Sequence, residues 1–264
     1  MLAIFVGVRA EHNAAERHID VLERQQLDGG YIISRGTFRD LPVLVCRTGL
    51  GEERVNGIVD EVIHEHPITA ILSARMAAAI PEKLSVGDLA FCLRSMLHRS
   101  GEDFIRKPSG EVDRRLLELG GRAATSAGIH HMVGDSLTFA PLNPVPVDRQ
   151  EMSGELGNVV VVDTEGYWLA EMAFEHKIPF LSVRVSLGSV YDQMTEALRL
   201  LGRRSYVSTW SALQQNLAHP TRLPNFIRLV DAVRTSCRSL SPFFKAFLSE
   251  WEEHPLPSRT ADQQ

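Results

Sequence analysis

The chain has 264 residues, of which 44% are hydrophobic and 23% are charged, and these values are ordinary for a soluble globular protein. A formal net charge of -5 argues against a nucleic-acid binder, which should be basic. The three cysteines, Cys46, Cys92 and Cys237, are scattered without metal-binding spacing, so we expect a reducing, cytoplasmic location. The first charge, Arg9, follows the apolar start, and no segment approaches the roughly 20 apolar residues of a membrane span.

The first half of the chain predicts alternating strands and helices. The apolar run LAIFVGV at 2–8 predicts a central strand that is buried on both faces. Residues 11–28 are expected to form a helix that ends at Gly29 and Gly30. Further strands are predicted at 31–36, 41–49, 69–74 and 86–97, the first two as a hairpin, and a glycine turn within 48–66 should open a second helix.

The second half continues the alternation and then becomes helical. An amphipathic helix is expected at 111–127, then HHMVGDSLTFA and a proline-rich loop at 140–148, and 158–188 should form strand, helix and strand. The alternation predicts an α/β fold, a three-layer αβα sandwich with a mixed central sheet, as one domain over 1–252. Helices are expected at 193–202, 209–218, 224–237 and 241–252, and a disordered tail at 253–264.

Polar residues follow several of the predicted strands, where α/β folds bind ligands. Arg9 and Glu11 lie beyond the first strand in GVRAEH, and RTGLGEERV places Gly49 and Gly51 before a helix. Such a turn can present backbone N–H groups to an anion, although many only change the chain direction. The other two places are VGDSLTF at 133–139 and VVVVDTEG at 159–166.

The last of these segments carries the clearest signal. Asp163 and Glu165 follow four valines, and a carboxylate placed directly after a buried strand is costly unless it meets a partner. Glu165 opens a helix, so it could simply stabilise the positive helix end. Alternatively, it could accept hydrogen bonds from the vicinal hydroxyl groups of a sugar, and the spacing alone does not decide between the two.

These motifs, in this order, resemble the nucleoside phosphorylase and nucleosidase superfamily. The motifs are GVRAEH, TGLGEERV, LSARMAAAIPEKLSVGDLA, VGDSLTF and VDTEGYWLAEMAFEHKIPFLSVRV, and they span roughly residues 1–200. The superfamily includes purine nucleoside phosphorylase and methylthioadenosine/S-adenosylhomocysteine nucleosidases. The tail LAHPTRLPNFIRLVDAVRTSCRSL is similar to the hopanoid-associated phosphorylases, which are adenosylhopane nucleosidases.

The resemblance implies cleavage of a purine N-glycosidic bond through a transition state that resembles an oxocarbenium ion. Glu165 matches the family position that holds the ribose diol, and Glu11 with Arg9 matches the side that activates water or holds phosphate. Inorganic phosphate is a candidate co-substrate, and no metal or organic cofactor is implied. The resemblance also implies a homo-oligomer. The candidate substrate-binding residues are Arg9, Gly49, Ser73, Arg75, Gly134, Asp135, Phe139, Thr164, Arg184 and Gly188.

The sequence departs from the family at positions that protonate the leaving base or line the ligand site. The family protonates the leaving purine with an aspartate after the VR strand, but here Gly188 stands at that place, and Asp192 is four residues further on. The family's glycine loop of the form S-x-G-x-A-G-G has Arg75, Ala78 and Ala79 in place of three glycines. Thr164 replaces the methionine that usually precedes the ribose glutamate.

Arg75 is expected where the strand ends, and three interpretations of it remain open. It could bind an anion such as a phosphate or a carboxylate, or fill a degenerate site by pairing with Glu11 or Glu165, or reach the solvent. The function is accordingly a nucleosidase or nucleoside phosphorylase, or else a catalytically degenerate relative that binds a ligand or partner.

Two other groups of residues are expected to have structural roles. His130 and His131 have no Asp, Glu or Cys at metal-ligand spacing, so we do not expect a metal site there. Cys46 and Cys92 fall within strand-like runs, so we expect them in the core. The helix SPFFKAFLSEW at 241–251 is a candidate for peripheral membrane contact, because a hopanoid substrate would place the protein near a membrane.

Overall fold

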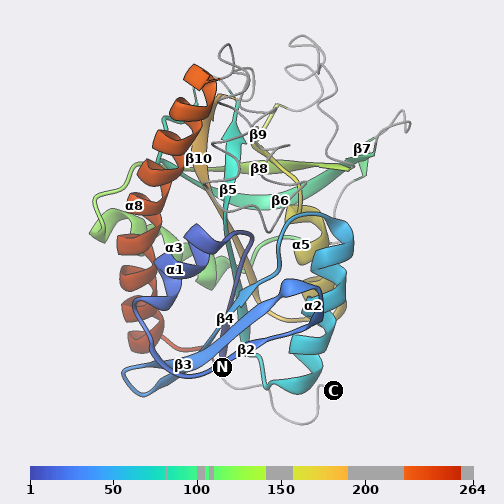
Figure 1. Ribbon diagram of the computed structural model, residues 1–264, viewed down its shortest axis with the longest axis vertical. Coiled ribbons are helices and arrows are strands. Elements are labelled where there is room, and N and C mark those ends of the chain that lie inside the picture. Colours follow the sequence, from blue (N-terminus) through green and yellow to red (C-terminus); the bar gives the residue numbers. More distant parts are fainter. Residues whose placement is uncertain (81–82, 100–104, 107–109, 141–156, 190–222, 257–264) are drawn as a thin grey trace.

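The computed structural model describes ten strands that belong to one sheet (Figure 1). The described residues are 1–80, 83–99, 105–106, 110–140, 157–189 and 223–256. The strands are β1 Leu2–Val6, β2 Asp20–Gln26, β3 Ile32–Phe38, β4 Leu41–Arg47, β5 Ala70–Ala79, β6 Leu89–Arg99, β7 Ile105–Arg106, β8 His131–Ala140, β9 Val159–Asp163 and β10 Phe180–Ser189.

The helices of the same residues cover both faces of this sheet. They are α1 Arg9–Glu16, η1 Asp28–Gly30, α2 Glu52–Glu65, α3 Arg114–Ser126, α5 Gly166–Glu175 and α8 Leu223–Glu253. Helices α1, α3 and α8 pack together on one side, and α2 packs with α5 on the other (Figure 1). The three-layer αβα sandwich with a mixed sheet and a helical C-terminus is thereby confirmed.

The strand order is β10-β6-β8-β9-β5-β1-β4-β3-β2, with β7 at the side of β6. Strand β5 pairs in parallel with β1 and β10, and antiparallel with β9. Because β10 also pairs with β6, the strands β5, β10, β6, β8 and β9 close into a ring, while β1, β4, β3 and β2 extend from it as an open sheet.

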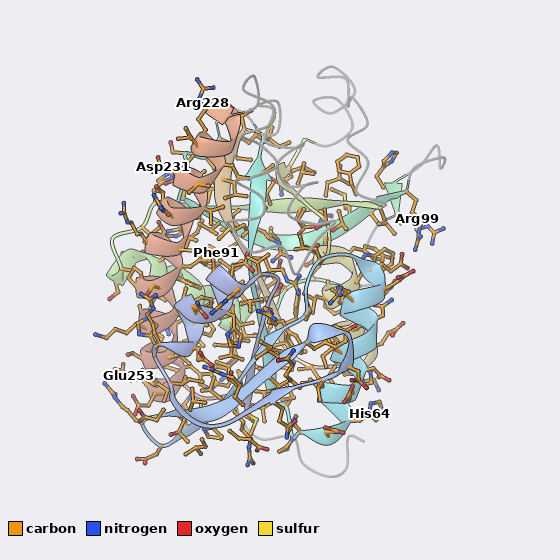
Figure 2. All side chains as sticks on the ribbon, in the orientation of Figure 1. His64, Phe91, Arg99, Arg228, Asp231 and Glu253 are labelled. Carbon is orange, nitrogen blue, oxygen red and sulfur yellow. The ribbon has the colours of Figure 1, made fainter. Side chains whose placement is uncertain are left out.

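Apolar side chains from each helical layer fill one face of the sheet. The first core cluster joins α1, α3 and α8 to the sheet, and Phe91 of β6 lies in it against Phe243 of α8. The second cluster joins α2 and α5 to the opposite face. Figure 2 shows Phe91 inside the molecule, whereas Arg228 and Asp231 project outward from α8.

Helix α8 is one continuous helix rather than the two that the sequence predicts. It runs through Pro242, and the apolar residues around the proline pack into the core. Phe243, Phe244 and Phe247 are fully buried, so the side chains that suggested a membrane contact for 241–251 are not at the surface. Among the described residues, no helix is long and apolar enough to cross a membrane.

The predicted helix at 11–28 is wrong in its second half. The helical segment is only Arg9–Glu16, and Asp20–Gln26 forms the edge strand β2, which pairs antiparallel with β3. All seven residues of β2 are exposed, so the sequence has no alternation of buried apolar and exposed polar residues that would indicate a strand. Pairing with β3 therefore overrides the local helical preference, and Gly29 and Gly30, with positive φ, turn the chain between the two strands.

Strand β5 also differs from its prediction. The sequence predicts that the strand ends near Ala74 and that a ligand loop begins there, but β5 continues to Ala79. The extension is held by β10 along one edge and by β9 at Ala78 and Ala79. Arg75 consequently lies inside a strand, not at its end.

Other predictions have mixed outcomes. The hairpin of β3 and β4 is confirmed, with its turn at Arg39 and Asp40. The strand–helix–strand prediction for 158–188 is confirmed as β9, α5 and β10. Residues 141–148 of the predicted proline-rich loop, the expected helices 193–202 and 209–218, Asp192, and residues 257–264 of the predicted tail lie outside the described residues. Glu253, the first residue of that predicted tail, belongs to α8.

Candidate functional site

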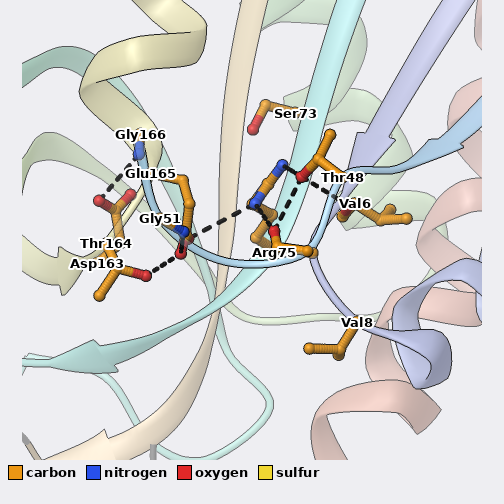
Figure 3. Close-up of polar contacts among 12 residues, drawn as sticks. Val6, Val8, Thr48, Gly51, Ser73, Arg75, Asp163, Thr164, Glu165 and Gly166 are labelled. Carbon is orange, nitrogen blue, oxygen red and sulfur yellow. Dashed lines mark hydrogen bonds and ion pairs between the residues drawn. The ribbon is translucent and has the colours of Figure 1, made fainter. Parts of the chain in front are cut away.

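Three chain segments that follow strands surround Arg75 (Figure 3). They are the link from β1 to α1, the link from β4 to α2, and the link from β9 to α5. The carboxyl ends of β1 and β4 lie at the same edge of the sheet because β1 and β4 pair in parallel. The link after β9, which runs antiparallel to β5, reaches the same place through the contacts of Glu165 with Gly51 N and Arg75, so the polar side chains of the three links meet in one buried cluster.

Glu11 is held by three backbone N–H groups. Its Oε2 accepts from Gly7 N at 2.6 Å and from Val8 N at 2.9 Å, and its Oε1 accepts from Met76 N at 2.6 Å. The side chain is 2% exposed. Burial raises the pKa of this carboxyl, while Arg75 and the three backbone donors oppose the rise. The result is a fixed carboxyl that joins the start of α1 to β5.

Glu165 is the residue that precedes α5, and its carboxyl makes no capping hydrogen bond to that helix. Its Oε1 accepts from Gly51 N at 2.9 Å and from the hydroxyl of Thr164. Its Oε2 lies 3.6 Å from Nη1 of Arg75, and both side chains are at most 3% exposed. Burial raises the pKa of Glu165, and the charge of Arg75 opposes that rise.

Arg75 lies between these carboxylates. Its Nη1 donates to Gly49 O at 3.1 Å, and its Nη2 donates to Thr48 Oγ1 at 2.5 Å. A Cβ atom added to Gly7 would lie 3.2 Å from Arg75 Nη1 and 3.3 Å from Glu11 Oε2, so all three are packed together. The side chain is 1% exposed, which rules out the interpretation that Arg75 reaches the solvent.

A second buried ion pair supports the first. Arg184 donates through Nε to Asp163 Oδ2 at 2.6 Å and through Nη1 to Ser73 Oγ at 3.1 Å. The other oxygen of Asp163 accepts from Thr138 Oγ1 at 2.5 Å and from Gly166 N at 3.0 Å. This network joins β5, β8, β9 and β10 to the start of α5, and thus fixes the backbone that carries Glu165.

The structure brings together some of the residues that the sequence singles out. Glu11, Gly49, Arg75, Thr164 and Glu165 belong to the Arg75 cluster through direct contacts. Ser73 and Arg184 adjoin it through the second ion pair. Arg9 begins α1 with an exposed side chain.

Three candidates have their contacts elsewhere. Gly134 faces β9, where a Cβ atom would lie 2.5 Å from Val160, and Asp135 pairs with Arg94 at 2.7 Å. Phe139 packs edge-on against His98 with ring centroids 5.4 Å apart.

Gly188, which stands where the resemblance places the acid, has φ of 103°, in the region that favours glycine. It lies in the β10 segment where the register with β5 shifts. Its N–H donates to Ser186 Oγ at 3.1 Å. This backbone conformation gives the position a local reason to be glycine.

Two threonines that are not among the candidates from sequence take part in these two networks. Thr48 accepts from Arg75, and Thr138 links Asp163 to Tyr167 N, which donates to its hydroxyl at 3.0 Å. Thr48 directly precedes the glycine turn, which is a signal that could have identified it. Among the described residues, no group of three His, Cys, Asp or Glu side chains could hold a metal ion.

Comparison with known structures shows the same fold. The 5'-methylthioadenosine/S-adenosylhomocysteine nucleosidase of Neisseria meningitidis, in complex with methylthio-immucillin-A, aligns with a TM-score of 0.68 at 15% identity, covering 92% of this chain and 98% of that one. The corresponding nucleosidase of Colwellia psychrerythraea 34H, in complex with adenine, gives 0.71 at 14% identity and 95% of each chain. Futalosine hydrolase of Helicobacter pylori gives 0.66 at 14% identity, covering 92% and 96%.

Sequence comparison places the chain in a family. No curated protein sequence matches it. The sequence profile of one family matches residues 2–200, which is well over half of the chain and includes every residue of the Arg75 cluster. The chain therefore belongs to the Phosphorylase superfamily.

Proposed function

We propose that the chain cleaves the N-glycosidic bond of a nucleoside-type substrate. The observation that carries this proposal is the convergence of two buried carboxyls, Glu11 and Glu165, on one point of the fold. They come from the ends of two different strands, which is how α/β enzymes assemble a site. The fold of the nucleosidases and the membership of the Phosphorylase superfamily support the same reaction class.

The two carboxyls suit different tasks. Glu165, with one oxygen held by Gly51 N, can accept hydrogen bonds from ribose hydroxyls through the oxygen that faces Arg75. Glu11 can accept a proton from a water molecule that attacks the sugar, and burial raises the pKa of its carboxyl, which makes the carboxylate a stronger base. Both tasks require Arg75 to withdraw from its present position between the carboxyls.

Protonation of the leaving base is the weak step of this mechanism. Gly188 has no proton to give, and Asp192 lies outside the described residues. A general acid contributes about 10²–10⁴-fold to such reactions. We therefore expect a slow reaction unless Asp192 or a neighbouring subunit supplies the acid.

The finer assignments are also proposals. We favour a purine nucleoside, and the resemblance of the tail supports adenosylhopane as one substrate to test. The reaction is either hydrolysis or phosphorolysis, with inorganic phosphate as co-substrate in the second case. A homo-oligomer is expected, since a neighbour could complete the site.

A second candidate function is ligand binding without cleavage. The specific observation in its favour is the buried pair of Arg75 and Glu165, which occupies the carboxyl that would hold ribose. A cation here also disfavours a transition state with positive charge on the sugar, because buried charges interact strongly. In this case the site would be a degenerate one that binds a ligand or a partner.

Release of free base separates the two candidates. The purified protein would be incubated with adenosine, inosine, methylthioadenosine, S-adenosylhomocysteine and adenosylhopane, each with and without phosphate. Base release that is lost in Glu165→Gln but kept in the exposed control Glu61→Gln supports cleavage at this site. Dependence on phosphate would identify phosphorolysis. No release from any substrate by the folded protein would favour the binding function.

A further inference from the structure

We propose that the site contains an oxyanion-binding position, formed by Arg75 and Arg184, that takes a phosphate or carboxylate group. The inference uses the location of the proposed function but does not depend on cleavage. The ligand class is defined by the chemistry of two guanidinium groups, which match the oxygens of carboxylate and phosphate. The resemblance has glycine at position 75, so this position would be a property of this chain.

The two arginines are neighbours in the sheet. Arg75 of β5 and Arg184 of β10 are register partners in a parallel pair, so their side chains leave the same face of the sheet. Arg184 is 0% exposed and Arg75 is 1% exposed. Burial lowers the pKa of Arg75, the charges of Glu165 and Glu11 oppose that change, and the charge of Arg184 adds to it. Two like charges side by side in the interior are expensive, and a shared anion is one way to compensate them.

Each arginine also has an N–H group without an acceptor. Among the described residues, Arg75 Nε and Arg184 Nη2 are buried and have no hydrogen-bond partner. An unpaired buried donor costs about 1–3 kcal/mol, and more when the group is charged. The carboxyls nearby do not meet this need, because Glu11 is occupied by backbone donors and Asp163 by Arg184, Thr138 and Gly166.

The distance between Arg75 and Glu165 is too long for a hydrogen bond. At 3.6 Å it exceeds the 2.7–2.9 Å of a charge-assisted hydrogen bond, whereas Arg184 and Asp163 meet at 2.6 Å. An entering oxyanion can therefore approach Arg75 without breaking a hydrogen bond to Glu165. Glu165 would remain in place through Gly51 N and Thr164.

The oxyanion could be free inorganic phosphate or an anionic group of the ligand itself, and titration calorimetry can distinguish these sources. The probes are inorganic phosphate, acetate, adenosine and adenosine 5'-monophosphate. We expect saturable binding of phosphate, or of the monophosphate in clear preference to adenosine. Binding of phosphate alone indicates free phosphate, and binding of the monophosphate alone indicates a group on the ligand; both support the position.

Two variants and one control test whether the anion binds beside Arg75. Arg75→Gln should weaken it at least about tenfold, since one guanidinium is lost. The control Arg24→Gln, an arginine exposed on the edge strand β2, should bind like the wild type. Glu165→Gln should bind the anion more tightly, because a competing negative charge is removed. This last variant leaves Arg75 intact and so tests the position even if Arg75→Gln fails to fold.

The proposal would be overturned by no saturable binding of phosphate, acetate or monophosphate to the wild type. Equal affinity in folded Arg75→Gln, or unchanged affinity in Glu165→Gln, would overturn it as well. Its failure is distinct from that of the proposed function. Anion binding without base release would leave the oxyanion position standing, and base release without anion binding would leave the cleavage standing.

Discussion

Arg75 and Glu165 form an ion pair of 3.6 Å inside the molecule, at the place where the sequence resemblance predicts that a sugar binds. Arg75 comes from the interior of β5 and Glu165 from the residue before α5, so the pair joins two elements far apart in the chain. The pair sets the charge of Arg75 beside Glu165 Oε2, the carboxyl oxygen that ribose would use, while Oε1 is held by Gly51 N and Thr164. Whether the site acts as an enzyme or a binding site depends on how easily this pair separates.

The strength of the pair can be measured with a double-mutant cycle of Arg75→Met and Glu165→Gln. Removing one partner of a buried ion pair costs about 3–5 kcal/mol, because the other charge is left uncompensated. We expect Arg75→Met to lower the free energy of unfolding by about 3 kcal/mol and the cycle to give a coupling of about 1–3 kcal/mol. Urea unfolding measures all four proteins.

The matched control for this cycle is the exposed pair of Arg122 and Glu250, whose side chains are 47% and 21% exposed. Surface pairs contribute about 0–1 kcal/mol, so this cycle should give a coupling below about 1 kcal/mol. A coupling for Arg75 and Glu165 no larger than the control would show that the pair does not hold the site closed.

The pH dependence of stability tests the burial of Glu11. Its folded pKa is raised above the ordinary value of 4.5, so the folded state binds a proton more tightly than the unfolded state does. The contribution of Glu11 to stability is therefore greatest below 4.5 and is lost as the pH rises through the folded pKa. We expect the free energy of unfolding to fall less between pH 4.5 and neutral pH in Glu11→Gln than in the wild type. Urea titrations at several pH values measure this, with Glu61→Gln as the exposed control, and an unchanged pH slope in Glu11→Gln would contradict the expectation.

Gly134 is expected to be required for packing between strands. A Cβ atom there would lie 2.5 Å from Val160 Cγ1 and 2.8 Å from Asn158 O. Overpacking of this kind costs about 1–3 kcal/mol, so Gly134→Ala should lower the melting temperature. Gly157→Ala is the control, since nothing lies within 4 Å of its added Cβ atom. If Gly134→Ala keeps wild-type stability but loses ligand binding, the packing role is wrong and the glycine serves the ligand.

The parts of the fold that could be predicted from sequence are those with continuous apolar runs. Strands β1 and β9 are buried on both sides, and their composition shows it. Strand β2 could not be predicted, because its seven residues are all exposed and it is held by pairing with β3. The extension of β5 depends on pairing with β9 and β10, which are more than 80 residues away in the chain and leave no local pattern.

The same division applies to the site. Glu11 and Glu165 could be selected because polar residues after buried strands point to a ligand edge. The sequence does not identify the ion-pair partner of Arg75, because Glu11 and Glu165 are both candidates. The structure places Arg75 in ion-pair contact with Glu165, since Glu11 is occupied by backbone N–H groups. Thr138 cannot be selected from the sequence, because its role depends on the approach of β8 to β9 and α5.

Restoring the residues of the family should raise the rate of base release. The double variant Arg75→Gly with Gly188→Asp removes the cation beside Glu165 and supplies a carboxylic acid at the place where the resemblance has one. Because a general acid contributes about 10²–10⁴-fold, we expect base release from adenosine or methylthioadenosine at least about 100-fold faster than in the wild type. Gly188 has φ of 103°, so the aspartate costs about 1–3 kcal/mol of backbone strain and the folded fraction must be measured alongside.

Arg75→Gly with Gly188→Asn is the matched control, since asparagine has the shape of aspartate but cannot donate its proton as an acid. It bears the same backbone strain, so a difference between the two double variants reports the acid alone. Faster release with aspartate than with asparagine would show that the rest of the site still supports glycosidic cleavage. Equal and negligible release from both folded variants would mean that Glu11 and Glu165 no longer form a working site, and would favour the binding function.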